Sequence, residues 1–381
     1  MMKITVDGKE LKGIIEKVEC NMMKKFTVSD LGRIILKAEN GKLTVSSTTV
    51  KNWLFVTMDR WIDVLEEGQI AIDKEDFKVI TRMTGDVIIT ESDNNIIVKN
   101  GKKTITLMKY SLEGYPILEA ETGTNKLQFK ESDLLEILTN MTVFCADNEN
   151  NKILQCINFN LSNSRIEALD GHRIALRTID DTEKLDQDGS ILLHMETLKD
   201  LKKSLDKKSD ALVTIAEGNK HIIITGKDFT YYQHITEGQY FNVGNMIDFY
   251  GDYSFKVDRE EMLSHIKYYT DNVISKSDRL PIVLKVENEK VITYAHNVRF
   301  ETSDELEIKD FYGKEIVIGF NPYFLLDALR IADVDNVSIK GVNSKSPIMI
   351  EGENAKYSFL VLPVNITDTK MNEYLERVNA A

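Results

Sequence analysis

The sequence contains the same pattern of elements three times. Short segments in which apolar and polar residues alternate start at Gly68, Gly189 and Gly313, and each is followed by an apolar-striped segment and a second alternating segment. Alternation with a period of two indicates a strand, whereas apolar residues spaced by three and four indicate an amphipathic helix. Each copy is therefore expected to form a strand, a helix of about three turns and a return strand.

Two further elements follow the same period. Segments typical of antiparallel hairpins start near residues 40, 163 and 288, and longer amphipathic helices are expected near residues 8, 130 and 258. The sequence thus predicts an α+β fold of three repeated domains, each with two helices packed on antiparallel sheets. The expected boundaries are 1–124, 125–250 and 251–366, and residues 367–381 form a C-terminal extension.

Composition favours a folded protein of the cytoplasm. Of the 381 residues, 42% are hydrophobic and 29% are charged, and no run approaches the roughly 18 apolar residues of a membrane span. The first residues lack the apolar run of a signal peptide. Cys20, Cys145 and Cys156 lie far apart without a Cys-x-x-Cys spacing, so neither a disulfide framework nor a structural zinc site is expected.

The peptide "LDGHRIAL" from Leu169 looks like a fragment of an active site. Asp170 and His172 could supply two members of a hydrolytic triad, but no serine or cysteine stands in a nucleophile context such as Gly-x-Ser-x-Gly. Phosphate-binding glycine loops and the His-Glu-x-x-His zinc motif are also missing from the sequence. We expect no enzyme activity, no metal and no cofactor, and we interpret Asp170 and Gly171 as a hairpin turn. A hydrolase that uses Asp170 and His172 is kept as an alternative.

One segment concentrates positive charge although the formal net charge is −13. Lys199, Lys203 and Lys207 are spaced by four, with Lys202 beside them, a spacing that stacks side chains along one flank of a helix. Either a solvated face or a phosphate-binding surface fits this pattern. No aromatic residues interleave for base stacking, so a nucleic-acid partner would be bound through its backbone and not by its base sequence.

Three stretches in order, "LDGHRIAL", "IGFNPYFLLDAL" and "YSFLVLPVNI", connect the sequence to a known family. The chain resembles the bacterial sliding clamp, the beta subunit of the replicative DNA polymerase III, from residue 1 to about residue 366. The resemblance implies a non-enzymatic processivity factor, in which two copies join head to tail into a ring around double-stranded DNA. Helices would face the hole and sheets the outside. It also implies a cytoplasmic, nucleoid-associated location.

The resemblance assigns roles to residues outside the repeat pattern. It places Lys25 in a DNA-contacting loop of the first domain and Lys152 in an inner loop of the second, in addition to the lysines between 199 and 207. It also implies a ring interface in which an apolar pair of the third domain faces an edge strand of the first domain of the other copy. The residues implied at this interface are Val273, Ile274, Ile105 and Leu107.

In the family, the hairpin turn that matches Gly171 lines a groove for short linear motifs of the replicative polymerase, the clamp loader and other replication and repair proteins. The residues that align with its walls are Leu154, Leu169, Gly171, His172, Arg173, Ile174, Phe241, Asn245, Asn321, Phe324, Pro347, Leu360, Leu362, Pro363 and Val364. Apolar anchors in such a groove carry most of the affinity.

The sequence departs from the family in several respects. Phe241 and Asn245 stand where proline and arginine are frequent, and Asn365 stands where arginine is common. These changes motivate the alternative of a specialised clamp paralogue, a binding platform for a narrow partner set.

The second departure is the tail after Ile366. An apolar stripe at Met371, Tyr374, Leu375 and Val378 is compatible with a short amphipathic helix, and a disordered tail is the alternative. We hypothesise that this stripe folds back toward the groove and competes with partner peptides.

Overall fold

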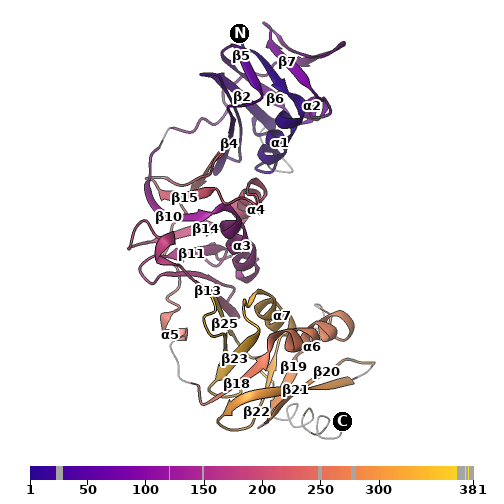
Figure 1. Cartoon of the computed structure of the whole chain (residues 1–381), viewed down its shortest axis with the longest axis vertical. Coiled ribbons are helices and arrows are strands. Elements are labelled where there is room, and N and C mark those ends of the chain that lie inside the picture. The colour runs from indigo at the N-terminus through magenta and orange to yellow at the C-terminus, as the bar shows by residue number, and fades with distance from the viewer. Residues whose placement is uncertain are drawn as a thin grey trace. The chain divides into compact units, whose positions relative to one another are not determined.

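The computed structural model describes residues 1–22, 29–119, 121–147, 150–247, 251–275, 280–287, 289–299 and 301–366, together with Tyr374 and Glu376. Over these residues the fold is α+β and consists mainly of antiparallel strands, as the sequence predicts. The chain divides into two compact units, residues 1–139 with 180–237 and residues 140–179 with 238–381 (Figure 1). Lys25 lies outside the described residues.

The first unit contains two antiparallel sheets. The strands of the five-stranded sheet are, in spatial order, β5 (Ile62–Glu66), β1 (Lys3–Asp7), β7 (Asp86–Glu91), β8 (Asn95–Asn100) and β9 (Lys103–Met108). Those of the eight-stranded sheet are, in spatial order, β10 (Thr124–Lys130), β15 (Leu212–Glu217), β16 (His221–Thr225), β17 (Phe229–His234), β4 (Asn52–Met58), β3 (Lys42–Thr48), β2 (Arg33–Glu39) and β6 (Gly68–Asp73). β4 and β17 pair with Leu54 opposite Tyr231, so one sheet joins strands of the first and second repeats.

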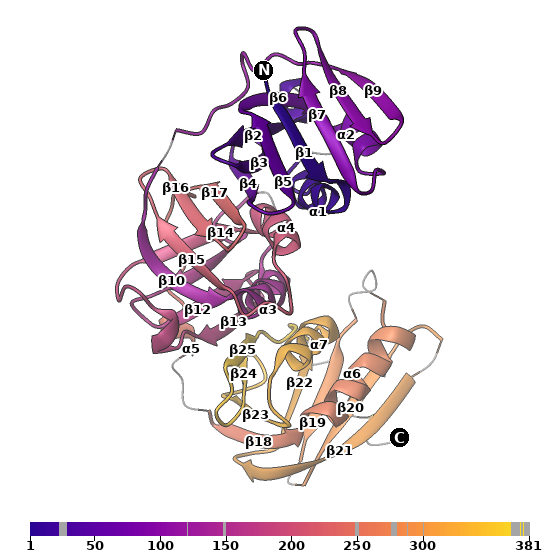
Figure 2. The same cartoon turned by 45° about the horizontal axis from the view of Figure 1, so that its top comes forward.

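The helices of the first unit lie where the apolar stripes predict them. They include α1 (Gly8–Glu19), α2 (Lys74–Ile80) and α4 (Met195–Ser204), and β14 (Ser190–His194) leads into α4. α1 begins after Asp7, whose carboxylate accepts hydrogen bonds from the backbone N–H groups of Lys9 and Glu10. Such caps satisfy N–H groups that have no partner within the helix. α1 contacts α4, so helices of two repeats lie side by side (Figure 2).

The second unit is organised around one long antiparallel arrangement of strands. These are, in spatial order, β11 (Cys156–Asn160), β12 (Arg165–Leu169), β13 (Arg173–Thr178), β25 (Tyr357–Val361), β24 (Ile348–Glu351), β23 (Asn336–Gly341), β18 (Tyr253–Asp258), β21 (Glu301–Tyr312), β20 (Lys290–His296), β19 (Ile282–Val286) and β22 (Ile316–Phe320). β13 pairs with β25, with Ile174 opposite Leu360. This pairing continues the sheet of the second repeat into that of the third.

The remaining elements are helical. The second unit contains α5 (Gly244–Ile247), α6 (Arg259–Asn272), α7 (Pro322–Ile331) and the 3₁₀ turn η2 (Thr142–Phe144). The chain also forms α3 (Glu131–Met141) and the 3₁₀ turns η1 (Ser29–Gly32) and η3 (Asp181–Glu183). Each repeat thus has the two helices that the sequence predicts: α1 and α2, α3 and α4, and α6 and α7. No helix within the described ranges is long and apolar enough to span a membrane.

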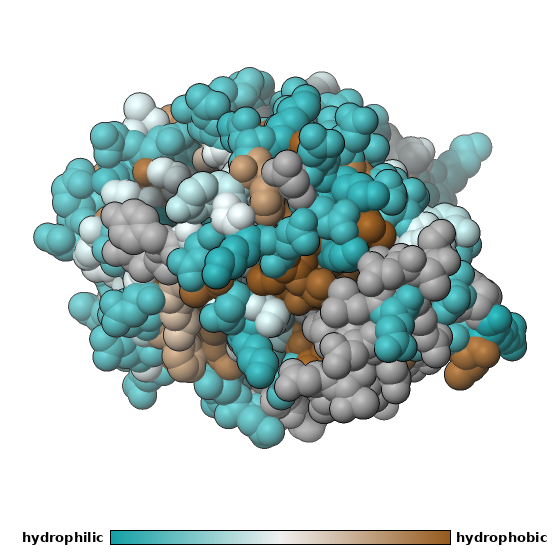
Figure 3. Space-filling view, turned by 90° about the horizontal axis from the view of Figure 1, so that it is seen from below, coloured by the Kyte–Doolittle hydropathy of each residue, from teal (hydrophilic) through white to brown (hydrophobic). Residues whose placement is uncertain are grey.

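The sheet of the third repeat is covered on both faces. On one face the Tyr269 hydroxyl, from α6, lies 2.8 Å from the Thr293 hydroxyl of β20. On the other face Tyr374 of the C-terminal extension is buried in a cluster with Val283, Ile292 and Tyr294. The face shown in Figure 3 is mostly hydrophilic, and hydrophobic residues are visible in its middle and at a few places nearer its margin.

Candidate functional site

The β12–β13 turn is the centre of the candidate site. Gly171 has a φ of +89°, in the left-handed region that glycine adopts without strain. Asp170 holds the turn from within, because its Oδ1 accepts hydrogen bonds from the backbone N–H groups of His172 (2.9 Å) and Arg173 (3.1 Å). The "LDGHRIAL" peptide therefore forms a hairpin turn, and its carboxylate is engaged in structural hydrogen bonds.

Arg173 connects this turn to the third repeat. Its Nε donates to Asp170 Oδ2 (2.9 Å), its Nη1 donates to Asp327 Oδ2 on α7 (2.7 Å), and its Nη2 donates to the carbonyl oxygen of Val143 (2.8 Å). The guanidinium also lies 4.7 Å from the ring centroid of Phe144 and 4.5 Å from that of Phe324. A planar cation between two aromatic faces and two carboxylates is strongly held, so the turn has a fixed position relative to α7.

The exposed side chains of His172 and Leu362 and the half-buried Phe324 lie at the same turn as this buried arginine. The imidazole of His172 stacks on Phe324, with ring centroids 5.9 Å apart and planes inclined by 20°. The backbone N–H of Leu362 donates to the carbonyl oxygen of His172 (2.9 Å), which places the exposed Leu362 side chain at the same turn. His172, Phe324 and Leu362 thus form the surface that a ligand can reach.

Other predicted wall residues support this surface from below. Leu169, Ile174 and Leu360 are buried in β12, β13 and β25. Asn321 caps α7, because its side-chain oxygen accepts from the backbone N–H of Tyr323 (3.0 Å). Leu154, Pro347, Pro363 and Val364 of the predicted wall are half-buried, as are Asn321 and Phe324, and the N–H of Val364 donates to the carbonyl oxygen of Gly319 (2.8 Å).

Phe241 and Asn245 lie on the segment that contains α5, and both are exposed. The segment is attached to β12 by Tyr240, whose hydroxyl donates to the carbonyl oxygen of Glu167 (3.5 Å). Burial raises the pKa of this phenol, which therefore stays neutral. The rings of Tyr240 and Phe241 lie edge to face, with centroids 6.3 Å apart.

The predicted lysine stripe is shorter than the spacing suggests. α4 ends at Ser204 and Leu205 has extended backbone angles, so the prediction that Lys207 continues the helix flank is wrong. Asp206 ends the helix, because its N–H donates to Glu131 (2.9 Å) and its carboxylate accepts from the N–H of Lys208 (2.9 Å). Such local hydrogen bonds compete with helix continuation.

The other predicted lysines differ in exposure. Lys199 and Lys203 are exposed on α4, whereas Lys202 is half-buried. Lys152 is exposed in the loop before β11. The sequence analysis missed two exposed lysines on the adjacent α1, Lys9 and Lys12.

One carboxyl lies among the lysines of α4. Burial raises the pKa of Asp200 to about 6, although Lys203 and Lys199 favour its charged form. Near neutral pH this carboxylate therefore reduces the positive charge of the α4 surface.

The predicted interface residues divide into two groups. The side chains of Val273 and Ile274 are only 4% and 2% exposed within the single chain, so they offer little surface to a second copy. Ile105 is half-buried and Leu107 is buried on β9, which forms the edge of its sheet. On the same strand Met108, which the sequence analysis did not select, is 63% exposed.

Comparisons with known proteins identify the family. Residues 128–242 match the central domain of the DNA polymerase III beta subunit, and residues 252–365 match its C-terminal domain. Together the two matches cover more than half of the chain. The beta sliding clamp of Lactococcus lactis is 22% identical over 382 residues, which cover 96% of this chain and 99% of that protein.

Solved structures share the fold over nearly the whole chain. A putative DNA polymerase III beta subunit from Eubacterium rectale superposes with a TM-score of 0.90 at 24% identity, covering 96% of this chain and 100% of the other. The polymerase sliding clamp of Bacillus subtilis superposes with a TM-score of 0.89 at 19% identity and the same coverage. The chain belongs to the family of the DNA polymerase III beta subunit, the bacterial sliding clamps.

Proposed function

We propose that this chain is a DNA polymerase processivity factor, a non-enzymatic clamp that encircles double-stranded DNA as a homodimeric ring and tethers polymerase to it. The observation that carries the proposal is the agreement with solved clamps over 96% of the chain. Membership of the clamp family also argues against the hydrolase alternative. In a cell we expect it in the cytoplasm, on the nucleoid.

The proposed domains are residues 1–124, 125–250 and 251–366. Two exposed lysines on α4 and two on α1 support a DNA-facing surface on these adjacent helices, with Lys152 as a further contact. Lys25 is proposed to add to this surface from its loop. Such a surface attracts phosphates without reading bases, and encirclement makes tight binding unnecessary.

Strand pairing between two copies supports the proposed ring. Among the described strands β9 has a partner on one side only, and Ile105, Leu107 and Met108 lie along it. Residues 301–307 of β21 pair with β20. The pairing of β18 involves the other end of β21, from Ile308 to Tyr312. The outer edges of β9 and of the first half of β21 could therefore pair between copies. Val273 and Ile274 would support that edge from inside the chain.

The turn at Gly171, with His172, Phe324 and Leu362, is proposed as the groove for linear motifs of polymerase, clamp loader and repair proteins. Phe241 and Asn245 are proposed as its outer wall. An apolar surface fixed by a buried arginine needs little reorganisation to receive a peptide, which favours binding.

Two measurements test the proposal. Negative-stain electron microscopy with light scattering should show a ring of twice the mass of one chain. After loading onto nicked circular DNA, the clamp should stay bound and should dissociate when the circle is cut, because a ring slides off free ends. A compact monomer, or retention that does not depend on circularity, would contradict the proposal.

A further inference from the structure

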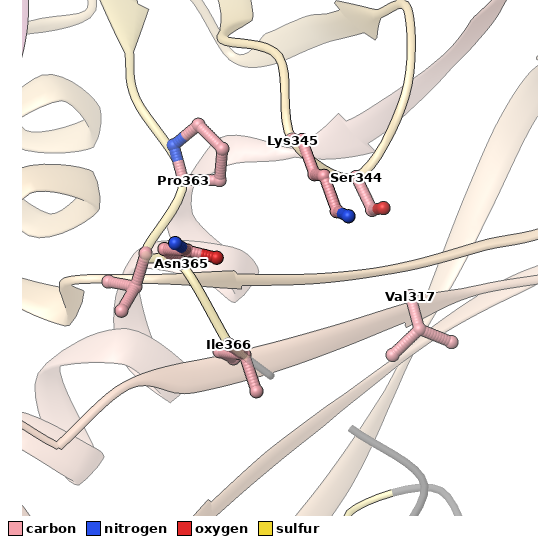
Figure 4. Close-up of a pocket in the computed structure, with 7 residues that line it drawn as sticks. Val317, Ser344, Lys345, Pro363, Asn365 and Ile366 are labelled. Carbon is pink, nitrogen blue, oxygen red and sulfur yellow. The ribbon is translucent and has the colours of Figure 1, made fainter. Parts of the chain in front are cut away.

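A pocket of about 320 Å³ lies beside residues 363–366 (Figure 4). Pro363 and Val364, which the sequence analysis assigns to the groove wall, also line this pocket. A peptide that crosses the groove along residues 362–364 would therefore reach the pocket directly. Because the pocket and the proposed groove share these two residues, we expect one ligand to occupy both.

The rim of the pocket is polar and positively charged. Ser344, Lys345 and Asn365 line it, and Ser344 and Lys345 are neighbours in one loop (Figure 4). Within the described part of the chain, no carboxylate lies within 4.0 Å of the Lys345 ammonium. An ammonium, a hydroxyl and an amide together can donate hydrogen bonds to a carboxylate.

The loop that carries Lys345 has a defined conformation. The Asn343 side-chain oxygen accepts a hydrogen bond from the backbone N–H of Lys345 (2.8 Å) and another from the Ser346 hydroxyl (3.1 Å). These bonds fix the direction in which the loop presents Lys345, although the lysine side chain itself is exposed. The loop backbone thus places Lys345 at the rim of the pocket.

The floor of the pocket is apolar and is supported by the C-terminal extension. Val317 and Ile366 line the floor, and both also pack on the cluster that buries Tyr374. Tyr374 therefore lies behind the pocket floor and not on the exposed groove surface. A ligand in the pocket would meet apolar contact below and donors at the rim.

We propose that this pocket extends the peptide groove and selects partner motifs that carry an aspartate or glutamate directly beyond their apolar anchors. The apolar anchors bind at His172, Phe324 and Leu362, and the acidic side chain is received by Lys345, with Ser344 and Asn365 as further donors. The inference rests on the proposed function, because it takes the peptide groove as given. It adds charge as a criterion by which this clamp distinguishes its partners.

The test uses peptides selected from a random library for binding to the purified full chain. The selected peptides are expected to contain an acidic residue next to their apolar anchors. Fluorescence anisotropy then compares each peptide with its matched Glu-to-Gln or Asp-to-Asn variant. The wild-type chain should bind the acidic form about three- to fivefold more tightly, as expected for an exposed ion pair, and the difference should shrink at high salt.

Charge reversal makes the test specific. Lys345→Gln should remove the preference, and Lys345→Glu should make the chain prefer a lysine at the same peptide position. Lys309→Glu, on β21 and outside the pocket, is the matched control and should keep the wild-type preference. Equal affinity of the wild-type chain for acidic and amide peptides would overturn the inference.

A second pair of variants separates this inference from the proposed function. His172→Ala and Phe324→Ala should weaken every selected peptide, whatever its charge. If these variants weaken the peptides but no acidic preference exists, the groove stands and the pocket inference is wrong. If neither variant affects any peptide, the groove proposal itself is wrong.

Discussion

Replacing Arg173 by alanine is expected to release the β12–β13 turn from α7. The side chain of Arg173 is 8% exposed, and those of its partners Asp170 and Asp327 are 15% and 25% exposed. The substitution removes a cation from between two carboxylates, and it leaves the carbonyl oxygen of Val143 without this donor. Two aromatic rings, Phe144 and Phe324, lose their contact with the guanidinium as well.

The expected loss of folding stability in Arg173→Ala follows from the burial of the charges. Removing one partner of a buried ion pair costs about 3–5 kcal/mol. Because Asp170 and Asp327 keep some contact with water, we expect the lower end, about 3 kcal/mol. For a unit of this size, such a loss lowers the melting temperature by about 6–12 °C. Asp327→Asn keeps a hydrogen-bond acceptor and should cost only about 1 kcal/mol.

The assay is thermal and urea unfolding of the full chain, with affinity for a groove peptide measured in parallel. Lys256→Ala is the matched control, because its ion pair with Asp310 (2.8 Å) is exposed, with side chains 48% and 67% accessible. Breaking that pair should cost less than about 1 kcal/mol and leave peptide affinity unchanged. Equal effects of Arg173→Ala and Lys256→Ala, or full peptide affinity in the Arg173 variant, would refute the reasoning.

Three further predictions concern charge and the C-terminal extension. Burial raises the folded-state pKa of Asp200 to about 6 from 3.8, so its ionisation reduces stability as the pH rises from about 4 to about 6. Asp200→Asn should therefore stabilise the chain at pH 7.5, by about 1 kcal/mol allowing for its partial exposure, and not at pH 4; an equal gain in melting temperature at both pH values would contradict this. Replacing Lys199 and Lys203 by glutamate should weaken association with DNA about tenfold at low salt while light scattering still shows the dimer; unchanged DNA association would remove α4 from the DNA-facing surface. Deleting residues 367–381 should uncover the apolar cluster around Tyr294 and lower the melting temperature; an unchanged melting temperature would mean that the extension adds no stability, and a higher peptide affinity would support competition for the groove.

The helices and hairpins could be predicted because their signals are local. The apolar stripe of α4 and the turn at Gly171 follow from spacing and from glycine chemistry within one segment. The end of α4 could not be predicted from apolar spacing alone. It depends on a hydrogen bond from Asp206 to Glu131, a residue 75 positions earlier in the chain.

The support of the site was less predictable than its surface. Family resemblance pointed to Arg173 as a groove residue, but the structure shows it buried, with a partner, Asp327, that lies 154 positions away. No local pattern contains that pair. Lys345 was missed for a similar reason, because a lone lysine in a loop gains meaning only when Val317 and Asn365 are found around the same pocket.

For the C-terminal extension, apolar periodicity predicts a buried face but not the element that covers it. An apolar stripe indicates a packing surface, and Tyr374 of the stripe is buried. The described contact is with Val283, Ile292 and Tyr294, and none of these belongs to the predicted groove wall. Met371, Leu375 and Val378 lie outside the described residues.

The pairings of β4 with β17 and of β13 with β25 have a mechanical consequence for the proposed ring. Each is a joint made by strand pairing, and each is reinforced by the polypeptide that links the two repeats it joins. A joint between β9 and β21 of different copies would use the same hydrogen bonds without a covalent link. A dimeric ring would then have four strand pairings within its chains, two in each copy, and two pairings between the copies that can separate. A loader that opens the ring would need to break only one β9 joint, so the lifetime of the closed ring should depend on that short edge strand and not on the strength of the groove.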